Sequence, residues 1–200
     1  MESEVNKVLT KYDTDTVIKD FARSIVNNPQ GNLKDHIDAV GISNATFYRI
    51  FGSKIDFEYK LKKKIQVVLS EIICISGSSF DDYYIGLRLI IEAHISNREI
   101  ICLLCTNPTY QEFSGGDPYD YEFNYWIPYQ KALNVFFQKS QSKGGFTLKC
   151  EPRMLTIHFL FTIVGVISAA MNGDIAEKNI AKEIEELFLH GVSSKKTNPD

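Results

Sequence analysis

The stretch from Asn32 to Lys54, NLKDHIDAVGISNATFYRIFGSK, constrains the fold of this chain more than any other part of it. Two short helical patterns meet there at a turn that contains Gly41, and Ser43 stands where its hydroxyl can cap the free N–H groups of the second helix. Apolar residues recur at helical spacing on both sides of the turn, so each helix has one face to bury. The stretch therefore predicts a helix-turn-helix.

The second of these helices, predicted to start at Asn44, has small and hydrogen-bonding residues at its outward positions. Phe47 and Phe51, four residues apart, form the apolar stripe that docks this helix. A helix with such a surface can enter a DNA major groove while nearby cations hold the phosphates on both sides. We therefore expect the segment to bind DNA.

The segment DHIDAVGISNATFYRIFGSKIDF resembles the N-terminal DNA-binding domain of the TetR family of transcriptional regulators. Gly41-Ile42-Ser43 matches the family's turn, Thr46-Phe47-Tyr48 its Thr-Leu-Tyr, and Phe51-Gly52-Ser53-Lys54 its Phe, two turn residues and Lys. The resemblance implies that the start of the second helix faces DNA and that Lys54 holds a phosphate. The candidate DNA contacts are Asn32, Lys34, Ser43, Asn44, Ala45, Thr46, Tyr48, Arg49 and Lys54.

The chain departs from the family's pattern in three places. His36 and Ile37 replace the usual Ile and Ala, and the link formed by residues 27–31 is shorter than usual. Ile50 stands where His or Tyr often contacts a phosphate, so we expect Ile50 not to touch DNA.

The formal net charge of −3 is unevenly distributed along the 200 residues. Residues 1–64 contain 11 Lys/Arg and 9 Asp/Glu, a net of +2, and the remainder contains 11 and 16, a net of −5. A few well-placed cations are enough for a specific reader of duplex DNA, so this charge permits DNA binding without proving it. The lysine run of residues 60–64 is interpreted as a solvated helix face.

Hydrophobic periodicity predicts helices along the rest of the chain, and hence an all-α fold. The expected helices cover residues 14–27, 54–77, 80–100, a stretch that ends near 142, 154–171 and 175–190. We divide the chain into a three-helix helix-turn-helix DNA-binding domain (1–53), a larger helical effector-binding and dimerisation domain (54–192) and a flexible tail (193–200).

The last two predicted helices have the apolar faces that a symmetric subunit interface needs. Met154 to Met171 has no formal charge, and we expect this helix to be buried on nearly all sides rather than to span a membrane. Together with Ile175 to His190 it would form a homodimer interface, in agreement with the four-helix dimer bundle that the TetR resemblance implies.

Residues 107–129 hold eight aromatic residues and four acids but no Lys or Arg. Pro128 predicts that the helix kinks or restarts there. Such a segment can form the wall of a pocket for a neutral or cationic apolar molecule, although ordinary core packing is about equally plausible for any one ring. The candidate ligand-binding residues are Tyr83, His94, Tyr110, Phe113, Tyr121, Phe123, Tyr125, Trp126, Tyr129 and His158.

These features favour a ligand-responsive regulator, expected to be a repressor, that binds a pseudo-palindromic operator as a homodimer and is released by an apolar small molecule. The polar N-terminus has no signal peptide, which predicts a cytoplasmic protein that does not bind membranes. No motif indicates catalysis, a metal or a cofactor. Two alternatives stay open: a helical small-molecule binding protein or enzyme that has lost DNA binding, and a regulator that senses oxidation at Cys102 and Cys105.

Overall fold

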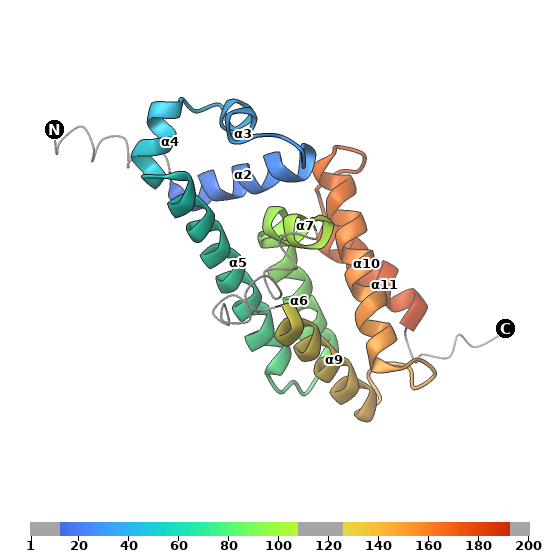
Figure 1. Ribbon diagram of the computed structural model, residues 1–200. Coiled ribbons are helices and arrows are strands. Elements are labelled where there is room, and N and C mark those ends of the chain that lie inside the picture. The colour runs from blue at the N-terminus through green and yellow to red at the C-terminus, as the bar shows by residue number, and fades with distance from the viewer. Residues whose placement is uncertain (1–12, 108–125, 193–200) are drawn as a thin grey trace. The chain divides into compact units, whose positions relative to one another are not determined.

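The computed structural model describes residues 13–107 and 126–192 (Figure 1). All regular elements in these two ranges are α-helices, so the predicted all-α class is confirmed. The helices are α2 (Thr14–Asn27), α3 (Leu33–Val40), α4 (Asn44–Phe51), α5 (Lys54–Gly77), α6 (Tyr83–Ser96), α7 (Arg98–Thr106), α9 (Trp126–Ser142), α10 (Pro152–Met171) and α11 (Ile180–Val192).

Contacts divide the chain into two compact units. Among the described residues, the N-terminal unit comprises everything up to Val68 together with Glu99 to Asn107. The C-terminal unit comprises Leu69 to Arg98 and the residues from Trp126 onwards. α5 therefore runs from one unit into the other, and most of α7 belongs with the helix-turn-helix.

Local capping sets the helix boundaries of the N-terminal unit where the sequence predicted them. Asp13 accepts a hydrogen bond from the backbone N–H of Thr16 at 3.0 Å and starts α2. Asn32 and Asp35 form a capping box at the start of α3, in which each side chain accepts a backbone N–H of the other residue. Ser53 caps α5 by accepting the backbone N–H of Asp56 at 3.1 Å. Because these bonds satisfy N–H groups that a helix start leaves free, the boundaries follow from local sequence.

Four phenylalanine rings form the centre of the N-terminal unit. Phe21 of α2 is fully buried, with its ring centroid 5.5 Å from that of Phe47 and 4.7 Å from that of Phe57. Phe51 lies 5.0 Å from both Phe47 and Phe57. The rings come from α2, α4 and α5, so this cluster holds these three helices together.

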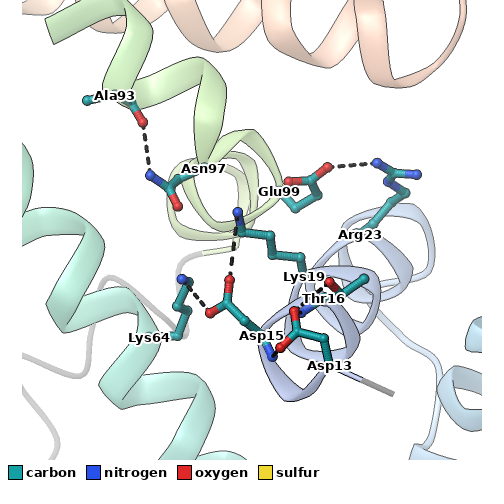
Figure 2. A network of polar contacts seen from close by, with 9 residues as sticks. All are labelled: Asp13, Asp15, Thr16, Lys19, Arg23, Lys64, Ala93, Asn97 and Glu99. Atoms are coloured by element: carbon teal, nitrogen blue, oxygen red, sulfur yellow. Dashed lines mark hydrogen bonds and ion pairs between the residues drawn. The ribbon is translucent and has the colours of Figure 1, made fainter. Parts of the chain in front are cut away.

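The lysine run at the start of α5 is more than a solvated face, and that interpretation is wrong for two of its members. Lys64 forms an ion pair with Asp15 of α2, and Lys60 donates to the backbone carbonyl of Ile50 at 3.2 Å (Figure 2 shows the Lys64 pair). Both side chains reach from α5 to a neighbouring helix of the same unit. Sequence spacing alone does not show where such long side chains end.

Two predicted helices of the C-terminal half differ in the structure. The helix expected over residues 80–100 is divided into α6 and α7, because Asn97 leaves the helical conformation and its side-chain amide donates to the Ala93 carbonyl at 3.1 Å. The last helix begins at Ile180 rather than Ile175, because Asn179 has a φ of 67°, a left-handed value that a continuing helix cannot contain. The helix expected to end near residue 142 is α9, which begins at Trp126 and has Pro128 in its first turn.

The expectation that α10 is buried on nearly all sides is also wrong. One face packs inside the protein through residues such as Leu155, Phe159 and Ile163, whereas Phe161 is 78% exposed. Within the described residues, α10 is the one helix long and apolar enough to cross a membrane, and 39% of its most apolar window is buried. Length and composition are all that this criterion tests, and a core helix can meet it as well.

The phenylalanine cluster generates a stability prediction. Phe21→Ala should lower the free energy of unfolding by roughly 3–5 kcal/mol, because it leaves a cavity among three buried rings. Urea denaturation followed by circular dichroism measures this loss. Ile55→Ala is the matched control, since Ile55 belongs to the same unit and is 77% exposed. Equal midpoints for the two variants would contradict the central role of the cluster.

Candidate functional site

The helix-turn-helix turn is fixed by one glycine and one serine. Gly41 has a φ of 75°, and its N–H donates to the carbonyls at the end of α3. The Ser43 hydroxyl accepts the backbone N–H of Thr46 at 3.1 Å and lies 2.9 Å from the Thr46 hydroxyl. Only a residue that tolerates positive φ fits at position 41, and only a short side-chain acceptor fits at position 43. The turn and the start of α4 are therefore fixed by local bonds.

The predicted DNA contacts lie on the surface of the N-terminal unit. Tyr48 is 50% exposed, and its ring lies edge-on to that of the buried Phe47, with ring centroids 5.3 Å apart. Thr46 is half-buried, and the remaining candidates are exposed: Asn32, Lys34, Ser43, Asn44, Ala45, Arg49 and Lys54. Ile50 is buried, with 6% of its surface exposed, and its lack of contact with DNA stays a prediction.

Besides Ser43 and Thr46, which bond to each other, Asn32 and Lys54 have intramolecular partners. The Asn32 carbonyl oxygen caps α3, accepting the backbone N–H groups of Lys34 and Asp35 at 2.9 and 3.2 Å. The Lys54 ammonium lies 3.6 Å from the Glu58 carboxylate, and both side chains are more than half exposed. An exposed pair of this kind is weak, so Lys54 can exchange Glu58 for a phosphate at little cost.

His36 explains how the short link before α3 is held, a role that the sequence did not reveal. Its Nε2 lies 3.1 Å from the Gly31 carbonyl oxygen, which can only accept, so Nε2 is the protonated nitrogen. The Ser24 hydroxyl, 2.9 Å from Nδ1, then donates to the ring. A Cβ at Gly31 would stand 2.9 Å from the imidazole Cε1. The departure from the family pattern at His36 thus accompanies the shortened link.

An ion pair joins α2 to α7 within the N-terminal unit. Arg23 Nη2 lies 2.7 Å from Glu99 Oε1, and Glu99 is only 7% exposed (Figure 2). The Arg23 side chain is 42% exposed, so only the carboxylate is buried, and the direct bond to the guanidinium compensates its charge. In the sequence, Glu99 stands out as a lone acid before the apolar run of α7. Nothing in the sequence indicates that Arg23 is its partner.

A cavity of about 350 Å³ lies between α2 and α3. Its lining is mainly polar, which does not suit the apolar molecule expected as effector. The lining residues are Asp20, Arg23, Ser24, Asn27, Asn28, Asp35, Ala39 and Val40.

Three of the predicted ligand-binding residues come together in the C-terminal unit. His94 Nε2 lies 2.7 Å from the Tyr129 hydroxyl, and the Trp126 ring lies 5.5 Å from that of Tyr129. His94 Nδ1 lies 2.7 Å from the Ile90 carbonyl oxygen, so Nδ1 carries the proton and Tyr129 donates to Nε2. Burial lowers the pKa of His94 to about 4, against the smaller opposing effect of the Ile90 bond. The imidazole is therefore neutral at physiological pH.

The other predicted ligand-binding residues do not join this group. Tyr83 packs against Phe136, with centroids 5.5 Å apart. His158 is on the exposed side of α10, stacked on Phe188 at 5.3 Å, whereas Phe159 beside it contacts His94. The remaining candidates, Tyr110, Phe113, Tyr121, Phe123 and Tyr125, lie outside the described residues.

The two cysteines of α7 are poorly suited to react with oxidants. Cys102 is fully buried, and neither cysteine forms a disulfide bond. Burial, with a smaller effect from Cys102, raises the pKa of Cys105 to about 12. A thiol with that pKa holds almost no thiolate at neutral pH, and the thiolate is the form that reacts with oxidants. Within residues 13–107 and 126–192, no group of His, Cys, Asp and Glu is arranged to hold a metal ion.

The buried imidazole makes stability depend on pH. Between pH 6.5 and about pH 4 the unfolded chain binds a proton that folded His94 refuses, so the free energy of unfolding should fall as the pH is lowered, by up to about 1.4 kcal/mol per pH unit. Urea titrations across this window measure the slope. His94→Gln, which keeps polar atoms there without a titrating ring, should flatten it. An unchanged slope in that variant would contradict the assignment.

No protein-family model matches the chain. This chain is 30% identical over 180 residues to the HTH-type transcriptional regulator NfxB of Pseudomonas aeruginosa. The alignment covers 89% of this chain and 93% of NfxB.

Solved structures share the fold. The TetR-family regulator PfmR from Thermus thermophilus matches with a TM-score of 0.56 at 16% identity, covering 87% of this chain and 97% of PfmR. The regulator FadR from Bacillus subtilis, solved with stearoyl-CoA, matches with a TM-score of 0.51 at 18% identity, covering 89% and 99%. The helix-turn-helix at α3 and α4, the all-helical fold and the similarity to NfxB agree, and the chain belongs to the TetR family of transcriptional regulators.

Proposed function

We propose that this regulator is a repressor that binds a pseudo-palindromic operator as a homodimer and releases it when an apolar small molecule binds. The observation that carries the proposal is the exposed face of α4, which offers hydrogen-bonding side chains while Phe47 and Phe51 fix it from behind. A helix held in this way can be inserted into a major groove without reorganisation.

In this proposal some of the DNA-binding residues contact bases and others contact phosphates. Asn44, Ala45 and Tyr48 read base edges, because they project from the first turns of the helix that enters the groove. Ser43, Thr46 and Lys54 hold phosphates, aided by the free N–H groups at the start of α4. A dimer would place two such helices in successive major grooves, with half-sites about one helical turn or slightly more apart.

We propose that the effector binds beside Trp126 and Tyr129, with the acidic and aromatic segment of residues 107–125 as part of the site. The neutral His94 contributes no charge, and the segment has acids but no Lys or Arg, which favours neutral or cationic apolar molecules. The stearoyl-CoA complex of Bacillus subtilis FadR is one case of a protein of this fold holding a long apolar chain.

Regulation would be a population shift. The effector must bind one arrangement of the two DNA-binding units better than the arrangement that fits the operator, and its differential affinity sets how far the equilibrium moves. The homodimer would form through α10 and α11, whose exposed apolar residues include Met154, Phe161 and Leu187. We place the protein in the cytoplasm, where the operator is. The pKa of Cys105 disfavours the alternative of a cysteine-based redox sensor.

Tyr48→Ala should weaken operator binding by about 10- to 100-fold at fixed salt, since one base-reading side chain contributes about 1–3 kcal/mol. Footprinting on DNA that flanks the protein's own gene would supply the operator fragment, and fluorescence anisotropy would measure the affinity. Ile85→Ala is the control, because Ile85 is a 55% exposed apolar residue of the C-terminal unit. Unchanged affinity for Tyr48→Ala would exclude α4 as the reading helix.

The chain has a single tryptophan, Trp126, so its fluorescence reports on the proposed effector site. Titration with tetraphenylphosphonium, an apolar cation, should change this fluorescence saturably and release the operator over the same concentration range. Palmitate, an apolar anion, should bind about tenfold more weakly, because it lacks a cation–π attraction of about 1.4 kcal/mol. Tighter binding of palmitate would contradict the preference for cations.

A further inference from the structure

We propose that one specific packing contact in α10 aligns the two protomers of the homodimer. In this contact, Phe161 of each protomer packs into the open space over the partner's Gly165. The inference rests on the proposed homodimer and adds the contact that fixes how the two copies fit together.

α10 has two apolar faces, and only one is used within the protomer. The inner face includes Leu155, Ile163 and Ile167, all fully buried. The outer face has Met154, Ile157, Phe161 and Gly165 at spacings of three, four and four residues, which places them in one stripe along the helix. Met154 is 52% exposed, Ile157 37% and Phe161 78%. Large apolar side chains aligned in this way usually mark a surface that another molecule covers.

Gly165 has no role inside the protomer that requires a glycine. It lies in the middle of α10, it is exposed, and it is absent from the residues with positive φ. A Cβ built on it would meet no atom of the described residues within 4 Å. Glycine destabilises a helix interior relative to alanine, so its presence here indicates a close approach from outside the chain.

The stripe is self-complementary. Phe161, a large protruding side chain, stands one helical turn before Gly165, a position with no side chain. A two-fold axis places residue i of one copy against residue j of the other and j against i, so both protrusions and both gaps are filled at once. Interdigitation of this kind requires a protrusion and a gap about one turn apart on the same helix face.

A second copy fits this stripe better than a lipid bilayer does. α11 packs beside α10 and carries Lys182 and Glu186, whose side chains are 75% and 59% exposed. The Arg88–Glu185 pair also joins α6 to α11, with the Arg88 side chain 60% exposed. Insertion of α10 into the hydrocarbon of a bilayer would either separate it from these charged neighbours or move their charges into hydrocarbon. Both changes cost free energy.

Two variants and their mixture test the pairing. Phe161→Ala removes the protrusion and Gly165→Leu fills the gap, so each alone should raise the dimer dissociation constant at least about tenfold in sedimentation equilibrium, in line with a loss of about 1.4 kcal/mol or more. Mixing them should restore a heterodimer, since the intact Phe161 of one variant then meets the intact Gly165 of the other, and the new leucine faces the new alanine. Native mass spectrometry distinguishes the heterodimer by mass.

Three controls separate the explanations. Leu148→Ala removes an apolar side chain that is 80% exposed in the same unit, and it should leave the dimer unchanged. Circular dichroism checks that each variant folds, and Gly165→Ala provides a milder filling if Gly165→Leu does not. Sedimentation with anionic and zwitterionic vesicles tests lipid binding.

A wild-type dimer whose two variants dimerise normally, or do not pair when mixed, would overturn this packing contact but leave the proposed homodimer intact. A monomeric wild-type protein at micromolar concentration would overturn both. Vesicle binding that Phe161→Ala abolishes would assign the stripe to a membrane and overturn the contact as well.

Discussion

The cluster of Phe21, Phe47, Phe51 and Phe57 is the constraint on which the rest of the N-terminal unit depends. α4 spans only Asn44 to Phe51 and would not be stable alone in water. Its two phenylalanines, four residues apart, dock it on α2 and α5 and so determine which of its faces remains outside. The polarity of that outer face is a consequence of this docking, because every apolar residue of the helix except Ala45 and Tyr48 is buried.

Polar contacts then adjust the positions that the cluster defines. His36 ties the short link to α2, and Lys60 and Lys64 attach α5 to the end of α4 and the start of α2. The Arg23–Glu99 pair extends the same unit to α7. α5 and α7 each contain residues of both units.

The C-terminal unit combines a closed core with an open helix face. His94 and Tyr129 are fully buried and satisfy each other, with one further bond to the Ile90 carbonyl. This leaves no buried charge in the group, which is compatible with an apolar ligand alongside. α10 has the opposite character on its outer side, where exposed aromatic and aliphatic residues surround a glycine. The same helix therefore supplies part of the core of the unit and an exposed apolar face.

The sequence by itself determined the elements whose cause is local. Helices α2 to α5 have the bounds that periodicity, the Ser43 and Ser53 caps and the glycines predicted, and the exposure of Ser43, Asn44 and Tyr48 followed from the positions of Phe47 and Phe51. Tertiary structure alone decided the long-range contacts, among them His36 with Ser24, Arg23 with Glu99 and His94 with Tyr129. It also decided the break at Asn97 and the open face of α10. Periodicity shows that a helix has apolar faces, but whether a face meets the same chain or remains uncovered depends on where distant helices pack, and long side chains find their partners only once that packing is set.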